Sequence, residues 1–485
     1  MMFNFKLILN VLGVLLIGLS TLMLIPTLID FINSNQTWVS FFISSLICLG
    51  LGISVFLSTR GDDKENKLTT KDAFLLTTAS WSVIAIFGAI PFYISNFEFS
   101  FTDAIFESMS GITTTGSTII TDLEAMTEGL LIWRSLLQWL GGIGIIVMAI
   151  SILPVLQVGG MQIFRTESSD TSDKILPRTA QVASAVLTIY ITLTSMCAFG
   201  YWLFGMGIFD AINHSMTTIA TGGFSTKSGS IGAFNSAGID YVSSIFMILA
   251  SLPILIYLQI YKGKISNFFK DQQINTFLAI IVLSCTLVVF YLWFYNIKDI
   301  SDAVRHGLFN VISIITGTGY TTDNYNLWGA FPIYLLFFGM FVGGCAGSTT
   351  CGIKVFRFQI LFETARNQIK KILHPHGVFI SHYNNKKLSD DVVTSVMSFF
   401  FIFILSFIII TLLLSTTQLD FITSLSAAAT SLANVGPGLG SSIGPEGNFF
   451  GIPFGAKWIL IFAMLIGRLE LFTVLVLVMP QFWKK

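Results

Sequence analysis

Four short segments, each containing a glycine turn, constrain this chain more than any other feature. They are SGITTTGS at residues 110–117, IATGGF at 219–224, ITGTGY at 315–320 and ANVGP at 433–437. Each has a glycine directly after a threonine or a valine, and glycine alone reaches positive φ without steric cost. The backbone can therefore turn its carbonyl groups to one side, and four such turns around one axis would form a ring of carbonyl oxygens.

A short, mostly apolar segment precedes each turn and is compatible with a half-helix that enters the membrane and stops. Nine residues before the glycines stand Glu107, Asn213, Asn310 and Ala427. Apolar stretches long enough to cross a bilayer flank each half-helix, so the unit of span, half-helix, glycine turn and span occurs four times. Irregular backbone at membrane depth is tolerated only where protein buries it or a water-filled cavity receives it. Four such units predict one central pore.

Ten windows of about 20 mostly apolar residues predict membrane spans. With 53% hydrophobic and 11% charged residues, the chain is not an ordinary water-soluble domain. The windows run over approximately 6–28, 38–58, 73–95, 130–155, 180–204, 238–261, 274–297, 329–373 (interrupted), 390–414 and 456–480. They predict an all-α polytopic membrane protein with an N-terminal transmembrane hairpin at 1–72 and pore repeats at 73–179, 180–272, 273–389 and 390–485.

Charged residues are distributed asymmetrically between the loops. With both termini placed in the cytoplasm, most lysines and arginines lie inside, which satisfies the positive-inside rule; the outer loops hold Lys227, Lys298, Arg305 and Lys457. Arg134, at the head of a span, is expected to snorkel outward. Any single outer acid can be ordinary loop charge, but their excess predicts a vestibule that concentrates cations. These acids are Glu98, Asp103, Glu107, Asp122, Glu124, Glu128, Asp210, Asp299, Asp302, Asp323, Asp420 and Glu446.

The second span of the third repeat is interrupted by ten small and polar residues: Gly343, Gly344, Cys345, Ala346, Gly347, Ser348, Thr349, Thr350, Cys351 and Gly352. Each glycine costs up to about 1 kcal/mol against alanine in a helix, so the helix should unwind below the ring. The alternative is a packing seam of small residues. Arg468 lies inside the last span, where an arginine costs about 2.5–3.5 kcal/mol, and carbonyls of the 343–352 loop are its expected partners.

The composition of the turns favours a monovalent cation. A conducting ion must exchange its hydration oxygens for others, and backbone carbonyls provide them without fixed charge. The glycine positions carry neither a carboxylate ring, as a calcium filter would, nor a basic ring, as an anion pore would. The half-helices would aim the negative ends of their dipoles at the cavity, and the hydroxyls of Thr113, Thr114, Thr115, Thr221 and Thr318 would supplement the carbonyls. The spans hold no paired acid and base and no metal-ligand spacing, so no enzyme is expected.

These motifs resemble those of the Trk/Ktr/HKT superfamily of potassium transporters, and within it the bacterial Trk-type membrane subunit. The resemblance covers nearly the whole chain. It rests on TTTGS at 113–117, TIATGGFST at 218–226, TGTGYTT at 316–322, NVGPGLG at 434–440, GGCAGSTTCGIK at 343–354 and Arg468. The extra N-terminal hairpin is similar to the Trk branch rather than to the shorter Ktr branch.

The resemblance implies potassium uptake across the bacterial inner membrane through a filter of backbone carbonyls, with K⁺ as the bound ion and no other cofactor. It implies an ion-binding set of Thr113, Thr114, Thr115, Gly116, Ala220, Thr221, Gly222, Gly317, Thr318, Gly319, Asn434, Val435 and Gly436. Gly116 stands where relatives that pass sodium commonly have serine. The 343–352 loop, held with the help of Arg468, would be an intramembrane gate below the filter.

The resemblance also implies partners. The chain is expected to form a homodimer in the lipid membrane, with one pore per chain and no nucleic-acid partner. A cytosolic nucleotide-binding subunit would control the gate and is expected to be a separate chain, because the GxG runs at Gly317 and Gly436 lack a strand-turn-helix context. The basic segment from Arg366 to Lys387 is expected to dock such a subunit or lipid head groups.

Three alternatives to a passive pore are compared with the sequence. An inverted-repeat carrier would have two repeats of opposite topology, whereas each repeat here is expected to begin and end inside. Coupling of potassium to protons or sodium through the same fold is the nearest alternative function. A purely structural or docking role would leave the four filter-like turns unexplained.

Overall fold

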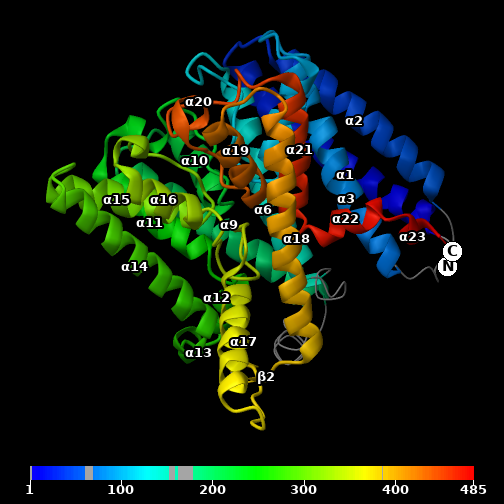
Figure 1. Ribbon diagram of the computed structural model, residues 1–485. Coiled ribbons are helices and arrows are strands. Elements are labelled where there is room, and N and C mark those ends of the chain that lie inside the picture. The colour runs from blue at the N-terminus through cyan, green and yellow to red at the C-terminus, as the bar shows by residue number, and fades with distance from the viewer. Residues whose placement is uncertain (1–2, 61–68, 152–158, 162–178, 385, 485) are drawn as a thin grey trace.

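The computed structural model describes residues 3–60, 69–151, 159–161, 179–384 and 386–484 (Figure 1). Within these residues, seven helices are long and apolar enough to cross a membrane, and up to nine spans result if each of two sharply bent helix pairs is one span. The all-helical, multi-span prediction is therefore confirmed. The loops expected at 61–67 and 165–178 lie outside the described residues.

A hairpin of two long helices, α1 (Phe5–Ile32) and α2 (Trp38–Thr59), lies at the edge of the helix assembly beside α3 (Figure 1). The buried carboxylate of Asp30 at the end of α1 accepts hydrogen bonds from the Thr37 hydroxyl and, at 2.8 Å, from the Gly129 backbone N–H. This contact attaches the hairpin to the start of α6. The two ends of the chain lie side by side, with the Phe3 and Phe482 rings 5.4 Å apart.

The remaining helices repeat one plan, in which a long helix is followed by a shorter helix that ends inside the protein. The first unit contains α3 (Thr70–Gly88), α4 (Ile90–Tyr93), α5 (Phe101–Ile112) and α6 (Glu128–Ser151). The second contains α9 (Thr179–Leu203), α10 (Ile208–Ile219), η1 (Ser230–Phe234), α11 (Ala237–Ala250), α12 (Ile254–Tyr261) and α13 (Ser266–Lys270).

The third and fourth units follow the same order. The third contains α14 (Gln272–Phe294), α15 (Ile300–Ile315), η2 (Tyr325–Leu327), α16 (Ala330–Gly339) and α17 (Val355–Leu373). The fourth contains α18 (Asp390–Ser415), α19 (Phe421–Ala433), α20 (Gly440–Ile443), α21 (Phe454–Arg468), α22 (Phe472–Val478) and α23 (Pro480–Trp483).

Three of the expected spans are broken rather than continuous. The expected interruption in the third unit is confirmed, since residues 340–354 between α16 and α17 are not helical. The continuous spans expected at 238–261 and 456–480 are wrong: α11 and α12 meet at 90°, and α21 and α22 meet at 119°. At the first break Pro253 stands directly before α12 and cannot supply the backbone N–H that a continuous helix needs. At the second break Glu470 and Leu471 have positive φ.

Helices α17 and α18 extend beyond the rest of the assembly (Figure 1). Between them, β1 (His382–Tyr383) pairs antiparallel with β2 (Lys386–Lys387). Lys370 and Lys371 lie in the last turn of α17, so the predicted basic segment occupies this protruding end.

Candidate functional site

Four helices, α5, α10, α15 and α19, end in the middle of the protein, and their C-terminal turns are buried. After each helix, one backbone N–H bonds back to the carbonyl five residues earlier. The four bonds are Thr115 N to Ser110 O at 2.9 Å, Gly222 N to Thr217 O at 2.9 Å, Thr318 N to Ser313 O at 2.9 Å and Val435 N to Thr430 O at 3.0 Å. The four turns therefore share one conformation and one register.

This register corrects the sequence prediction in the second repeat. The glycine that follows the bonded residue has positive φ in every turn, and it is Gly116 (+87°), Gly223 (+74°), Gly319 (+78°) and Gly436 (+113°). Gly222 instead occupies the position of Thr115, Thr318 and Val435, so Gly223 is the equivalent glycine. The residue nine positions earlier is accordingly His214, not Asn213. The parallel between Gly223-Phe224 and Gly319-Tyr320 was the signal that could have set the register.

The four glycines form a closed ring, named here the glycine ring (Gly116, Gly223, Gly319 and Gly436). A Cβ atom added to each would meet a carbonyl oxygen of the next repeat. A Cβ atom on Gly116 would lie 2.2 Å from Gly222 O, and one on Gly223 would lie 1.9 Å from Thr318 O. A Cβ atom on Gly319 would lie 1.9 Å from Val435 O, and one on Gly436 would lie 2.9 Å from Thr115 O. The contacts run from repeat one to two, two to three, three to four and four back to one. Each turn therefore touches the next in a cyclic order, and the four oxygens are called the ring carbonyls below.

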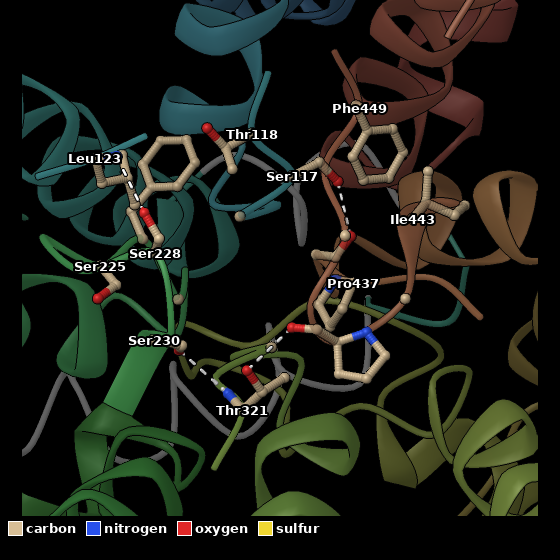
Figure 2. A pocket seen from close by; sticks show the side chains of 18 of the residues that line it. Ser117, Thr118, Leu123, Ser225, Ser228, Ser230, Thr321, Pro437, Ile443 and Phe449 are labelled. Carbon is tan, nitrogen blue, oxygen red and sulfur yellow. Dashed lines mark hydrogen bonds between the residues drawn. The ribbon is translucent and has the colours of Figure 1, made fainter. Parts of the chain in front are cut away.

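A cavity opens onto the glycine ring and is lined by all four of its members. Figure 2 shows hydroxyl-bearing side chains around it, from Ser117, Thr118, Ser225, Ser228, Ser230 and Thr321. The cavity's lining within the described chain includes Arg134 and Lys227 but no carboxylate, so none of the acids expected in the outer loops lines this cavity.

Three of the acids expected in the outer loops have partners in the protein. Asp103 pairs with Lys457 at 2.6 Å, and Asp323 pairs with Lys298 at 2.9 Å. Glu124 accepts hydrogen bonds from the backbone N–H and hydroxyl of Ser228. Burial raises the pKa of Glu124, but the hydrogen bonds from Ser228 outweigh it and leave the pKa below its ordinary value. Negative charge therefore stays near the rim rather than inside the cavity.

Arg134 does not snorkel outward; its side chain is 1% exposed and bonds to Glu107 at 2.7 Å. Its guanidinium also donates to the Ser225 carbonyl at 2.8 Å. Glu107 in turn accepts from the Ile119 backbone N–H at 3.0 Å. A buried charge needs a charge partner and hydrogen bonds. Through these hydrogen bonds the Arg134–Glu107 pair links the segment after the first turn, at Ile119, to the segment after the second turn, at Ser225.

The threonines of the turns mostly bond to protein atoms. The hydroxyls of Thr113 and Thr115 lie 2.8 Å apart, and that of Thr318 lies 2.8 Å from Thr316. The hydroxyl of Thr221 lies 3.3 Å from that of Thr349. These hydroxyls therefore brace the turns, and the supplement that they were expected to give to the carbonyls stays a prediction.

The interrupted segment, residues 340–354, contacts the first and second turns. The contact between Thr221 and Thr349 joins it to the second turn, and the Cys351 sulfur lies 4.0 Å from the Thr114 hydroxyl in the first. Backbone groups at the break between α11 and α12 form hydrogen bonds with backbone groups of the interrupted segment. Cys345 N donates to Ser251 O at 3.0 Å, and Ile254 N donates to Gly347 O at 2.9 Å. Two broken helices thus complete each other's hydrogen bonds.

Arg468 reaches this segment from the end of α21. Its guanidinium donates to the Thr349 carbonyl at 3.1 Å and to the Gly141 carbonyl of α6 at 2.9 Å. The predicted contact with a carbonyl of the 343–352 loop is confirmed.

Two further buried cations at this place were missed from sequence. Lys354 donates to the Thr350 carbonyl at 2.6 Å. Arg357 is fully buried and bonds to Glu470, in the break after α21. Glu470 is distant in sequence from Arg357, so no local pattern could reveal the pair.

The site offers oxygen atoms of the backbone rather than charged ligands. Among the described residues, no group of three His, Cys, Asp or Glu side chains could hold a metal ion. What the geometry can provide is a ring of uncharged carbonyl oxygens that replaces the hydration shell of a cation.

The chain was also compared with known proteins. A model of the TrkH family, described as cation transport protein, matches residues 39–485. The chain is 43% identical over 482 residues to the Trk system potassium uptake protein TrkI of Halomonas elongata, covering 99% of this chain and 97% of that protein. It is 37% identical over 490 residues to the Trk system potassium uptake protein TrkH of Escherichia coli K12, covering 99% of this chain and 100% of that protein.

A solved structure agrees. The crystal structure of the potassium transporter TrkH from Vibrio parahaemolyticus matches with a TM-score of 0.91 and 36% sequence identity, covering 99% of this chain and 100% of that chain. The repeated turns, the interrupted segment and these matches over nearly the whole length lead to one conclusion: this chain belongs to the TrkH family of cation transport proteins.

Proposed function

We propose that this chain is the potassium-conducting membrane subunit of a Trk uptake system. The observation that carries the proposal is the cyclic contact of each glycine of the ring with a carbonyl oxygen of the next repeat. Four uncharged oxygens around one axis suit a monovalent cation that must enter and leave easily. The buried C-terminal ends of four helices add favourable negative potential at the same place.

The ion passes the glycine ring and meets the interrupted segment, which acts as the gate. The segment's contacts with the first and second turns support this position, since Cys351 lies next to Thr114 and Thr349 next to Thr221. Arg468 holds the Thr349 carbonyl and so stabilises the closed arrangement. A further hydrogen bond, to the Gly141 carbonyl, anchors the arginine to α6 and gives the segment a fixed support.

The protein works in the bacterial inner membrane as a homodimer, with both termini in the cytoplasm. A separate cytosolic nucleotide-binding subunit docks on the protruding end of α17. Lys370 and Lys371 give this end a basic surface suited to an acidic partner. Because α17 begins at Val355, directly after the interrupted segment, movement of its cytosolic end reaches the gate through one helix.

Ion competition in liposomes tests the proposal. Purified protein is reconstituted, and K⁺ uptake is measured with Rb⁺, Na⁺ or Li⁺ as competitor. We expect Rb⁺ to compete strongly and Na⁺ and Li⁺ weakly. Equal competition by Na⁺, or no monovalent flux from protein that remains folded, would contradict the proposal. Repeating the measurement with and without a proton or sodium gradient separates passive conduction from coupled transport.

A further inference from the structure

One face of α6 lies along the ion path. Arg134, Gln138 and Gly141 are spaced by four and three residues and therefore share this face. Arg134 contacts the chain after the turns, and the Gly141 carbonyl holds Arg468. Gln138, between them, is fully buried, and its side chain hydrogen-bonds to the second turn.

The Gln138 amide binds the second turn at two points. Its Nε2 donates to the Gly222 carbonyl at 2.6 Å, and its Oε1 accepts from the Phe224 backbone N–H at 3.0 Å. The two points lie on either side of Gly223. One side chain therefore fixes both peptide groups that flank the ring glycine.

This contact explains why two glycines stand in a row. Gly223 is required by its positive φ and by the Thr318 carbonyl. Gly222 has no such φ, but a Cβ atom there would lie 2.5 Å from Cδ of Gln138 and 2.6 Å from its Oε1. Glycine at 222 lets the amide of Gln138 approach the backbone.

The second turn differs from the other three in what holds its ring carbonyl. Thr115, Thr318 and Val435 are β-branched and conformationally stiff, whereas Gly222 has no side chain and the greatest backbone freedom. Among the described residues, a side-chain donor reaches the ring carbonyl of Gly222 but not those of Thr115, Thr318 or Val435. Gln138 supplies from α6 the rigidity that the turn's own residue lacks.

We propose that Gln138 is a specificity-determining positioning residue, which holds the Gly222 carbonyl at the ring diameter that suits K⁺ better than Na⁺. The inference rests on the proposed potassium conduction. Without the hydrogen bond, the Gly222 peptide can tilt toward the axis and contract the ring around a smaller ion. Loss of Gln138 should therefore change selectivity more than conduction.

The test measures K⁺ and Na⁺ flux in liposomes for the unmodified chain, Gln138→Leu and Gln138→Glu. Leucine removes both hydrogen bonds, and glutamate retains the shape and the acceptor but not the donor to Gly222. We expect the K⁺/Na⁺ flux ratio to fall about tenfold in both variants, with K⁺ flux largely retained; a tenfold change corresponds to about 1.4 kcal/mol. Trp139→Phe, which removes a 3.2 Å hydrogen bond from α6 to Thr194, is the matched control and should keep the ratio.

The outcomes distinguish the role of the Gln138 hydrogen bonds from potassium conduction itself. An unchanged ratio in a folded, conducting Gln138 variant overturns the inference, as does an equal fall in Trp139→Phe. If the unmodified chain carries no K⁺ in the same assay, the proposed function fails first. If both single variants fail to fold, the double variant Gln138→Ala/Gly222→Ala is measured instead, because the alanine at 222 replaces part of the lost side-chain volume. We again expect a lowered K⁺/Na⁺ flux ratio. An unchanged flux ratio in the double variant also overturns the inference.

Discussion

Replacement of Gly319 by serine is the perturbation for which the structure gives the clearest magnitude. Gly319 has φ of +78°, and an added Cβ atom would lie 1.9 Å from Val435 O and 2.8 Å from Cδ of Pro437. A side chain in this backbone conformation costs roughly 1–3 kcal/mol. The contact with Val435 O cannot be kept, so a ring carbonyl must move.

The displaced oxygen belongs to the proposed ion site, so selectivity should change. We expect the K⁺/Na⁺ flux ratio of Gly319→Ser in liposomes to fall at least about tenfold, which is about 1.4 kcal/mol of discrimination. Gly436→Ser should show a smaller fall, because its added Cβ would lie 2.9 Å from Thr115 O.

The matched control is Gly205→Ser. Gly205 has φ of +96° with no atom within 4 Å of an added Cβ, so it carries backbone strain without touching the ring. Its ratio should equal that of the unmodified chain. The reasoning is refuted if Gly319→Ser conducts K⁺ with an unchanged ratio, or if Gly436→Ser loses more selectivity than Gly319→Ser.

Three further predictions concern the interrupted segment and the buried ion pairs. Arg468→Ala releases the Thr349 carbonyl and should raise K⁺ flux severalfold at an unchanged ion preference; lower flux from folded protein would show that the segment is not a gate. Deleting residues 344–350 should raise flux in the same assay, and a closed pore after the deletion would contradict the proposed path. Glu470→Gln leaves Arg357 buried without its charge partner, which should cost about 3–5 kcal/mol of stability and lower the thermal unfolding midpoint in detergent. The control Glu446→Gln changes an exposed side chain and should not shift the midpoint. Equal midpoints for both variants would show that the Arg357–Glu470 pair is dispensable.

The general plan of the molecule could be predicted from sequence because its determinants are local. Glycine turns, apolar windows and the polar run at 343–352 each lie within a short stretch of chain, and the structure has four such turns and a break at 340–354. The breaks after Ala250 and Arg468 were missed because hydropathy averages over a window and does not detect a bend between two apolar segments.

The details of the site depend on contacts that no short stretch contains. Gly222 was taken for a ring glycine because two adjacent glycines fit the motif equally well, and the contact that distinguishes them comes from Gln138 on another helix. Arg134 was expected to reach water because its partner Glu107 lies in a different helix. Sequence therefore predicts where the turns are, and packing between the repeats decides which atoms line the ring.

We propose that four peptide carbonyls on one axis hold a dehydrated potassium ion. The most direct measurement is anomalous diffraction from crystals of the protein grown with Rb⁺ in place of K⁺. We predict a peak on the axis of the glycine ring, next to the carbonyl oxygens of Thr115, Gly222, Thr318 and Val435. A ring without a peak, or a peak coordinated by side chains away from this axis, would contradict the account.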